Sequence, residues 1–519
     1  MAIGLTAAMT AARSSLTAQQ QALAVTANNI SNANNTKYHK QSVLFTDNVE
    51  ILDVTGYYGT GVSVGSISRA YSSALESSLA NAYTSDGYNQ TSLEYSSQVE
   101  SLLVPDGEST IVDNVTNFMD AMQSVQTAPE DSTYREEFIS AAQTLAETLN
   151  TSYSSLSTIC AGIASSSNPT GELTGGTAKD AVDEVNTLLE QLSSLNEQIS
   201  NLETYSSRGS DANDLRDTRD ALVQDLSKYL KVNVSEGTDS RYTITTTDDA
   251  GNSVNLLYVS GTGTSNYKTE VNSVEAYLVD GEISFQVTDS SSGSTYVLKN
   301  TGELGAYSDS YSYVGEEMKK IYNPDYDPLD ATTYPGYAQA IAEKVNGILE
   351  GGYDLNGNTG VANDVFVELT GAYSGSVMTV VSGFKASQVA ASDTAGVQGN
   401  GNNMDALWNY FQYSDSVNQT VIYSGIDPST GLEQGSATTL GGYANSYVND
   451  IASTVSQMGT SANTSAATVT MYQNAIAGTS GVNSDVELTN MLAIQQAYAA
   501  SAKVISTIQS MYDTIFATI

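Results

Sequence analysis

Apolar side chains recur at helical spacing near the start of this 519-residue chain. Successive positions alternate between steps of four and three residues, which is the rhythm of a heptad seam. Gln19 and Thr26 interrupt it with polar groups. The seam comprises Leu5, Met9, Ala12, Leu16, Gln19, Leu23, Thr26 and Ile30. The pattern predicts one long helix with a narrow apolar stripe.

A second seam with the same rhythm runs to the C-terminus. It comprises Met491, Ile494, Tyr498, Ser501, Ile505, Ile508, Tyr512, Ile515 and Ile519. Only Lys503 and Asp513 are charged between Leu488 and the end, and Arg13 is the only charged residue among the first 36. A solvated coiled coil would carry Glu and Lys beside its seam. The small uncharged flanks therefore indicate helices that are surrounded by protein.

The two terminal seams favour a pairing of the two ends. An amphipathic helix packed on a globular domain is the plainer interpretation of one such segment, but two nearly uncharged helices at opposite ends are less easily explained that way. Either helix alone would expose a long apolar stripe and could not offset the entropy lost on ordering. We therefore expect both ends to be disordered in the monomer and to fold together on polymerisation.

Between the ends, long helices are expected first and strands afterwards. Residues 71–230 have helical periodicity, with a polar turn after Leu202 that predicts a helical hairpin. From Val232 to about Ser382 the chain is rich in Thr, Val, Tyr and Gly, and segments 241–247 and 282–287 alternate with period two. A helix near 337–349 is expected within this part, and helical periodicity returns from about Gly441 to Ile476.

These elements predict an α+β multidomain protein: a mainly α rod with an inserted β-rich outer domain. We expect residues 1–70 and 480–519 to form a terminal helical core in which the two ends pair. Residues 71–235 and 386–479 would form the helical rod, and residues 236–385 the β-rich outer domain. More than one domain is also the expectation for a chain of this length.

The charge of the chain argues against nucleic acid and membrane partners. Lys and Arg number 19 against 58 Asp and Glu, giving a formal net charge of −39. Such a chain repels nucleic acid and anionic lipid surfaces. The sequence also shows no run of about 18 apolar residues and no secretory signal.

Cysteine and histidine are too scarce for much common enzymology. Cys160 is the only cysteine, so no intramolecular disulfide can form, and a small buried residue is the favoured interpretation over a nucleophile. His39 is the only histidine, which excludes His-based triads and multi-His zinc sites. We therefore expect no catalytic residues, no cofactor and no metal site.

Two weaker signals remain in the central segment. Residues 354–360 begin like an EF-hand loop, but Thr359 stands where Gly is needed and Val365 where Glu is needed, so a polar turn is favoured. The chain has 33 tyrosines against a single tryptophan, Trp408. Tyrosine platforms for glycans on the outer domain are conceivable, but ordinary surface and core tyrosines are the better interpretation.

Segment 27–41 resembles the N-terminal signature of flagellar rod, hook and hook-associated proteins. The matching residues are Asn28, Asn29, Ile30, Asn32, Thr36 and Tyr38. Lys37 replaces the family Gly, and Lys40 replaces the usual Arg. Segment 495–507 is similar to the C-terminal signature of the same family, with Gln496, Tyr498 and Lys503 among its residues, and segment 61–69 resembles a third family motif.

Further segments resemble the family of first hook-associated proteins. They are residues 213–226, Gln41 and residues 399–407. The resemblance implies a structural, non-enzymatic subunit of the bacterial flagellum that joins hook to filament. It also implies export in an unfolded state through the type III channel, and therefore an extracellular location without a cleaved signal. A hook protein is the first alternative, and a secreted glycan-binding protein or adhesin is the more distant one.

The partners implied by this resemblance are other proteins. They are copies of the chain itself, the hook protein, the next junction protein toward the filament, and an export chaperone bound to the C-terminal helix. Neither nucleic acid nor a membrane is among them. The terminal seams would be the assembly surfaces.

Overall fold

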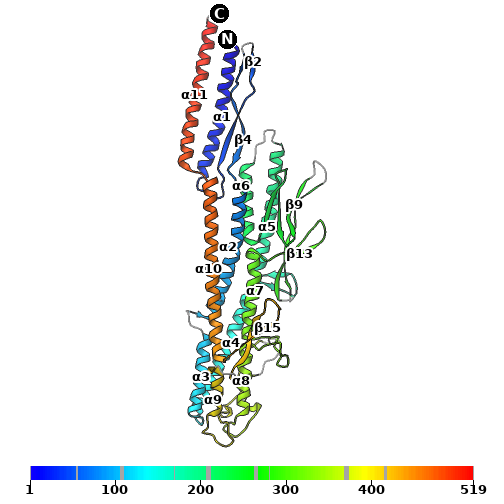
Figure 1. Cartoon of the computed structure of the whole chain (residues 1–519), viewed down its shortest axis with the longest axis vertical. Helices are drawn as coiled ribbons and strands as arrows, with labels where there is room; N and C mark the ends of the chain where they lie inside the picture. The colour runs from blue at the N-terminus through cyan, green and yellow to red at the C-terminus, as the bar shows by residue number, and fades with distance from the viewer. Residues whose placement is uncertain are drawn as a thin grey trace.

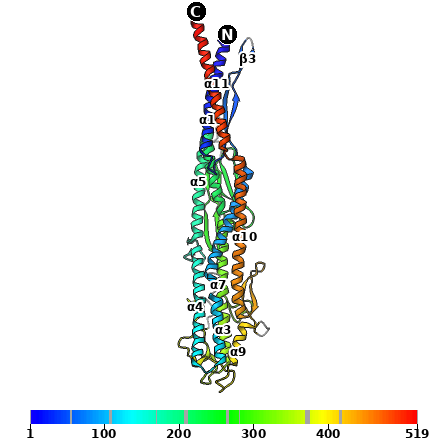
Figure 2. The same cartoon turned by 90° about the vertical axis from the view of Figure 1, so that its left-hand side faces the viewer.

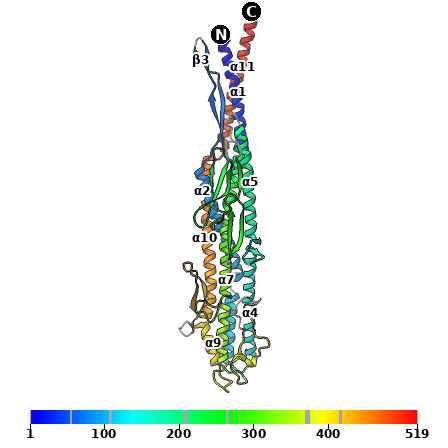
Figure 3. The same ribbon diagram turned by 90° about the vertical axis from the view of Figure 1, so that its right-hand side faces the viewer.

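The computed structural model describes residues 2–517 apart from 54–55, 106–109, 169, 206–211, 262–266, 280, 368–372, 374 and 414–417. The described chain forms a slender rod with both termini at one end (Figure 1). Views from the two sides show the same narrow outline (Figures 2 and 3). The chain therefore runs away from the terminal end and returns to it.

Long helices make up most of the rod. The terminal helices are α1 (Ala2–Ser31) and α11 (Ser484–Ala517), and α10 (Leu440–Ser480) leads directly into α11. Next to α10 lies α2 (Ser73–Leu103) over much of its length. The remaining α-helices are α3 (Thr110–Thr127), α4 (Ser132–Ile163), α5 (Thr177–Tyr205), α6 (Asn213–Tyr229), α7 (Gly302–Ile321), α8 (Tyr337–Gly351) and α9 (Asn402–Gln412).

A β-ribbon, residues 41–69, extends from the rod along α1, and we call it the arm. It consists of β1 (Gln41–Asp47), β4 (Val62–Arg69) and, beyond them, the short pair β2 (Ile51–Asp53) and β3 (Gly56–Tyr58). β1 and β4 are antiparallel, with Gln41 opposite Arg69 and a bulge between Leu44 and Phe45. Figure 1 shows α1 between the arm and α11.

Two small antiparallel sheets lie on one flank of the rod. One has the order β10-β9-β8-β7, and the other has the order β11-β12-β13. Buried and half-buried residues alternate along β8, as its period-two sequence predicts. The strands are β7 (Asn233–Glu236), β8 (Tyr242–Thr247), β9 (Ser253–Ser260), β10 (Lys268–Val271), β11 (Val274–Val279), β12 (Glu282–Thr288) and β13 (Thr295–Val297).

The short elements complete the description. Two further hairpins pair β5 with β6 and β14 with β15. Their strands and the 3-10 helices are β5 (Ser165–Ser166), β6 (Leu173–Gly175), β14 (Thr420–Ile426), β15 (Glu433–Thr438), η2 (Val361–Asn363) and η3 (Ala386–Gln388).

The expected fold class, an α-helical rod with a β-containing part, is confirmed. The helix expected near 337–349 is α8, Tyr337–Gly351. α7 was not expected: it lies inside the supposed β-rich part, yet it packs against α2 and α4. Strands therefore fill only the first portion of 236–385. The division into terminal core, rod and outer domain stays a prediction.

One hydrophobic core runs through the rod. At the end far from the termini it contains Phe118, Phe138, Phe366 and Phe411, none more than 1% exposed. The ring centroids of Phe118 and Phe138 are 5.1 Å apart, and those of Phe118 and Phe411 are 5.8 Å apart. A separate small cluster, Leu79, Ala82 and Val469, joins α2 to α10 nearer the termini. Apolar burial is thus richest far from the terminal helices.

Replacing Phe138 by Ala is expected to destabilise the rod by about 3–5 kcal/mol, because it opens a cavity in a fully buried aromatic cluster. Urea denaturation measures the change. Tyr134→Ala is the matched control, because Tyr134 lies on the same helix and is 38% exposed. Equal losses of unfolding free energy in the two variants would contradict the placement of this core.

Candidate functional site: the joint between the terminal helices and the rod

The structure places the two predicted seams against each other, on α1 and α11. On α1 the seam residues Leu5, Met9, Leu16, Leu23 and Ile30 are all half-buried. On α11, Ile508 is buried, Met491, Ile494, Ile505 and Tyr512 are half-buried, and Tyr498 and Ile515 are exposed. Ile519 lies outside the described residues. The role of these residues in assembly stays a prediction.

Hydrogen bonds fix the register between the two helices. The hydroxyls of Ser15 and Ser501 are 2.9 Å apart, and those of Thr6 and Tyr512 are 3.4 Å apart. Gln20 donates from Nε2 to the Tyr498 hydroxyl at 3.4 Å. These contacts run along most of α1, so the helices are antiparallel partners over nearly their full length.

The arm covers a second face of α1 that the heptad pattern did not reveal. Ala7, Ala18 and Ala22 are buried although they lie outside the seam. Ser14 donates to the carbonyl of Thr60 at 3.2 Å. Gly61 has φ +97, and a Cβ there would lie 2.2 Å from Ser14 Oγ, so only glycine permits this approach. The signal in the sequence was the run of small residues on α1.

Asn29, a residue of the N-terminal family motif, links three segments where α1 meets the rod. Its Nδ2 donates to the Gln41 carbonyl at 2.9 Å and to Glu487 Oε2 at 3.1 Å. Its Oδ1 accepts from the Gln41 backbone N–H at 3.0 Å and from the Tyr38 hydroxyl at 2.8 Å. Only 1% of Asn29 is exposed. One amide therefore ties α1 to the arm and to the start of α11.

The other motif residues lie around Asn29 or farther along α11. Asn32 donates from Nδ2 to the Asn28 carbonyl at 3.0 Å, which extends the end of α1. Thr36 is exposed in the turn that follows. Gln496 and Lys503 are exposed on α11, away from the joint. The motif thus contributes both to the joint and to an exposed helix face.

Glu487 anchors α11 to the segment that precedes the arm. Its carboxylate lies 2.7 Å from Lys40 Nζ and is 2% exposed. The Lys40 backbone N–H also donates to the Ser480 carbonyl, at the end of α10, at 2.8 Å. Lys40 therefore holds the start of α11 with its ammonium group and the end of α10 with its backbone.

His39 lies buried between two carboxylates from different helices. Its Nδ1 is 2.8 Å from Asp217 Oδ1 on α6, and its Nε2 is 3.1 Å from Glu76 Oε1 on α2. The His39 backbone N–H also donates to Asp217 Oδ2 at 3.1 Å. Burial disfavours the imidazolium, but the hydrogen bonds to Asp217 and Glu76 outweigh it and raise the pKa of His39 to about 9. The ring is therefore a cation at neutral pH.

Arg69, the last residue of the arm, supplies the second cation of this cluster. Its NH1 donates to Asp217 Oδ1 at 2.8 Å and to Asp220 Oδ2 at 2.5 Å. Its guanidinium also lies over the Tyr71 ring, 4.4 Å from the centroid. His39 and Arg69 together balance acidic groups that would be costly to bury alone. We call His39, Arg69, Glu76, Asp217 and Asp220 the joint network.

The joint network contains side chains of the types that bind metal ions. The guanidinium of Arg69, however, already pairs with its two aspartates. Ligand atoms of His39, Asp217 and Asp220 lie within 4.8 Å of one another. Arg69 donates to both carboxylates, and the His39 ring nitrogens are engaged with Asp217 and Glu76. These residues therefore form ion pairs and offer no open coordination position.

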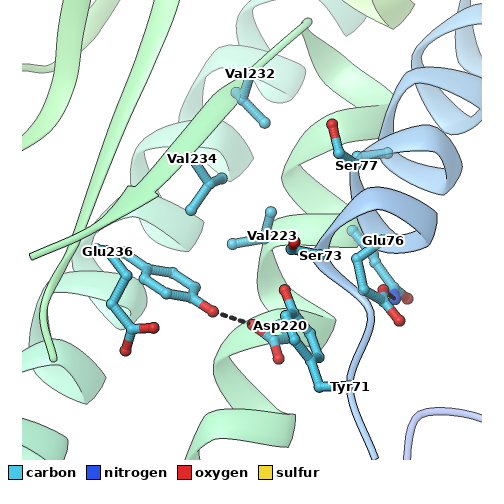
Figure 4. Close-up of a pocket in the computed structure, with 12 residues that line it drawn as sticks. Tyr71, Ser73, Glu76, Ser77, Asp220, Val223, Val232, Val234 and Glu236 are labelled. Carbon is cyan, nitrogen blue, oxygen red and sulfur yellow. Dashed lines mark hydrogen bonds between the residues drawn. The ribbon is translucent and has the colours of Figure 1, made fainter. Parts of the chain in front are cut away.

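A hollow of about 170 Å³ lies beside the joint network, between the start of α2, α6 and β7 (Figure 4). Tyr71, Val232 and Val234 line it, and the Tyr242 hydroxyl donates to Asp220 Oδ1 at 2.7 Å. Its acidic lining residues each have a cationic partner in the chain. Glu236, for example, pairs with Arg216 at 2.8 Å. The acidic side chains that line the hollow are thus engaged by other residues of the chain.

Comparison with models of known protein families identifies the family of the chain. The model of the flagellar hook-associated protein FlgK helical domain matches residues 96–366, which is more than half of the chain. This chain belongs to the FlgK family. The model of the flagellar basal body rod FlgEFG protein C-terminal region matches residues 473–517 of this FlgK-family chain, and that of the flagella basal body rod protein matches residues 9–38.

Relatives of similar length carry the name flagellar hook-associated protein 1. The Bacillus subtilis protein is 26% identical over 97% of this chain and 96% of its own length. The Escherichia coli K12 protein is 24% identical over 97% of this chain and 98% of its own length. A solved structure, the flagellar hook junction protein FlgK from Burkholderia pseudomallei, covers 77% of this chain and 99% of that chain with TM-score 0.48 and 15% identity.

The resemblance to hook-associated proteins is thus confirmed, and the FlgK-family chain is a structural component of the flagellum. In the part of the chain that the structure describes, no helix combines the length and the apolar character needed to cross a bilayer.

The stability of this FlgK-family chain is expected to fall between pH 6.5 and pH 9. The pKa of His39 is about 9 in the folded chain, against an ordinary value of 6.5 that applies to the unfolded chain. Its stabilising effect is therefore fully present below 6.5 and is lost as the pH rises through 9, by about 3 kcal/mol. Urea denaturation at a series of pH values measures the loss.

His39→Gln is the matched variant, because Gln keeps a hydrogen-bonding side chain without a titrating ring. It should remove most of this pH dependence. If wild type and His39→Gln lose the same free energy of unfolding over the interval, His39 is not the group responsible.

Proposed function

We propose that this chain is a structural subunit that joins the flagellar hook to the filament and carries out no catalysis. The similarity to hook-associated proteins 1 over 97% of the chain carries the proposal. The match to the FlgK helical domain favours this assignment over a hook protein. The arrangement of the terminal helices gives the proposal a physical basis.

The terminal helices leave apolar surface that suits burial by other subunits. Leu492, Val504, Met511 and Phe516 of α11 are exposed, although α11 already packs on α1. Exposed apolar surface of this kind marks an interaction site. Copies of the same chain are the proposed partners within the tier, with the hook protein on one side and the next junction protein on the other.

The same surfaces support folding of the ends during assembly. Most seam residues are only half-buried by the α1–α11 contact, so the pair gains little apolar burial to offset its ordering entropy. We propose that the chain is exported unfolded, with a chaperone covering α11, and that the two ends become ordered when neighbouring copies bury them outside the cell.

The lone histidine, the lone cysteine and the EF-hand-like segment are all held in structural roles. His39 is held in the joint network, and burial raises the pKa of the Cys160 thiol to about 12, so it is not a thiolate at neutral pH. Asp354, in the EF-hand-like segment, accepts backbone N–H bonds from Asn356 at 2.8 Å and Asn358 at 2.7 Å. That geometry belongs to a polar turn. These observations favour a structural role.

Ile505→Asp is expected to prevent incorporation into the flagellum while the rod stays folded. Burying a charge in the assembled seam would cost on the order of 3–5 kcal/mol at each copy. Electron microscopy of a deletion strain that carries the variant measures filament formation, and circular dichroism of the purified chain checks the rod. Ile505→Val is the control and should assemble. Normal filaments on Ile505→Asp cells would contradict the role of the seam.

Immunogold labelling with an antibody against residues 236–385 tests the location. A narrow band of label at the boundary between hook and filament is expected. Label along the whole hook would instead assign the chain to the hook, and a flagellum without label would overturn the proposed function.

A further inference from the structure

The segment 37–41 connects α1 to the arm, and its side chains alternate between two sets of partners. Tyr38 donates from its hydroxyl to Asn29 on α1 at 2.8 Å, and Lys40 pairs with Glu487 on α11 at 2.7 Å. The odd-numbered residues of the segment contact α6 instead. A change in the way the segment lies on α6 would therefore move both terminal helices.

One face of α6 carries three acids, which we call the acidic row: Asp214, Asp217 and Asp225. Each acid of the row takes one odd-numbered residue of the segment. Gln41 donates from Nε2 to the first acid at 2.8 Å, His39 Nδ1 lies 2.8 Å from the second, and Lys37 donates from Nζ to the third at 2.9 Å. The segment thus runs antiparallel to α6 in one register.

The acidic row has a gap and a cationic end. Ala221 lies one turn from Asp217 and one turn from Asp225 on the same face, and it lines a hollow of about 440 Å³. Lys228 follows the last acid and lies 2.9 Å from its other carboxylate oxygen. Because the spacing of the charges is uneven, a shifted register cannot repeat the same set of pairs.

A shift of the segment by one turn toward the end of α6 is disfavoured twice. His39 would lie at Ala221 and lose its carboxylate on α6. Lys37 would lie at Lys228, so two cations would meet. Unpaired buried charge and like-charge contact both destabilise this register.

A shift by one turn toward the start of α6 is opposed mainly by Lys37. His39 and Arg69 would each still meet an acid of α6, because the row continues to Asp214. Lys37 would move to Ala221 and lose its carboxylate. Lys37 also stands where the family motif has Gly, so the motif did not reveal this contact.

Apolar packing does not choose the register. Among the described residues, the hydrophobic clusters of the rod include none from α1, the arm or α11. A further polar contact holds the arm, because Asn213 donates from Nδ2 to the Ile67 carbonyl at 2.9 Å. Apolar contact is weakly directional, whereas ion pairs and hydrogen bonds require particular partners. The register therefore rests on the polar side chains along α6.

We propose that the acidic row is a register key: it accepts the segment 37–41 in one register only, and that register sets the position of α1 and α11 on the rod. Lys37 is the positioning residue that opposes the shift toward the start of α6. This inference rests on the proposed function, because the terminal helices must meet those of neighbouring copies. A chain in the shifted register would hold its terminal helices about 5 Å out of place.

Charge reversal at Lys37 tests the register key. Lys37 is 47% exposed in its pair with Asp225, so Lys37→Glu should lower incorporation into flagella by about fivefold. Asp225→Lys in the same chain should restore most of the incorporation, and Lys37→Arg should behave as wild type. Immunoblots of purified flagella and of the medium measure the two fractions. Wild-type incorporation of Lys37→Glu, or no rescue by Asp225→Lys, would overturn the register key.

A carboxylate placed in the gap of the row gives a second test. Ala221→Asp removes no contact, but it offers Lys37 a partner in the shifted register. Two registers of similar free energy would then share the chains, so incorporation should fall by about twofold. Ala221→Asn has the same shape without the charge and should incorporate as wild type, and the hollow leaves room for either side chain. Equal incorporation of the two variants would overturn the register key.

Urea denaturation of the purified variants separates a register change from a loss of folding. Lys37→Glu and Ala221→Asp should leave the free energy of unfolding of the rod as in wild type. A loss of rod stability that accounts for the lost incorporation would count against the register key. Absence of the unsubstituted chain from the flagellum would instead overturn the proposed function, so the two failures are distinguishable.

Discussion

Compensation of buried carboxylates is the constraint on which the rest of this structure depends. Asp217 and Asp220 on α6 and Glu76 on α2 are all buried where the terminal helices meet the rod. Leaving one of them unpaired would cost several kcal/mol, so His39 and Arg69 must come to them. His39 precedes β1 and Arg69 ends β4. Satisfying these acids therefore fixes both ends of the arm, and the arm in turn lies against α1.

The terminal helices pair mainly through apolar contact and not through buried ion pairs. They contain five charged residues between them, Arg13, Asp485, Glu487, Lys503 and Asp513, and most residues of their seams are only half-buried. Apolar contact is weakly directional, so it supplies association energy without fixing orientation. Directional ion pairs and hydrogen bonds at the joint provide the orientation. A subunit divided in this way can present its apolar surface to neighbouring subunits at one defined angle.

Several parts of the fold followed from periodicity, and one did not. The contact between the seam faces of α1 and α11 and the bounds of α8 follow from the helical period. The period did not reveal the second buried face of α1, and Tyr498 and Ile515 of the α11 seam are exposed. α7 was missed because Gly302–Ile321 is rich in Ser, Tyr and Gly, which weakens the apolar pattern. Its helix is supported by packing against α2 and α4, a tertiary contribution that propensity cannot reveal.

The sequence by itself determined the family, the fold class and which face of each terminal helix is apolar, because motif and period are local properties of the chain. Only the tertiary structure decided what the lone histidine does. Arg69 and Asp217 are 148 residues apart, and Asn29 and Glu487 are 458 apart. A charged or amide side chain can pair with any of many partners, and nothing in local spacing selects among them. The folded rod selects them by bringing α1, the arm, α2, α6 and α11 to one point.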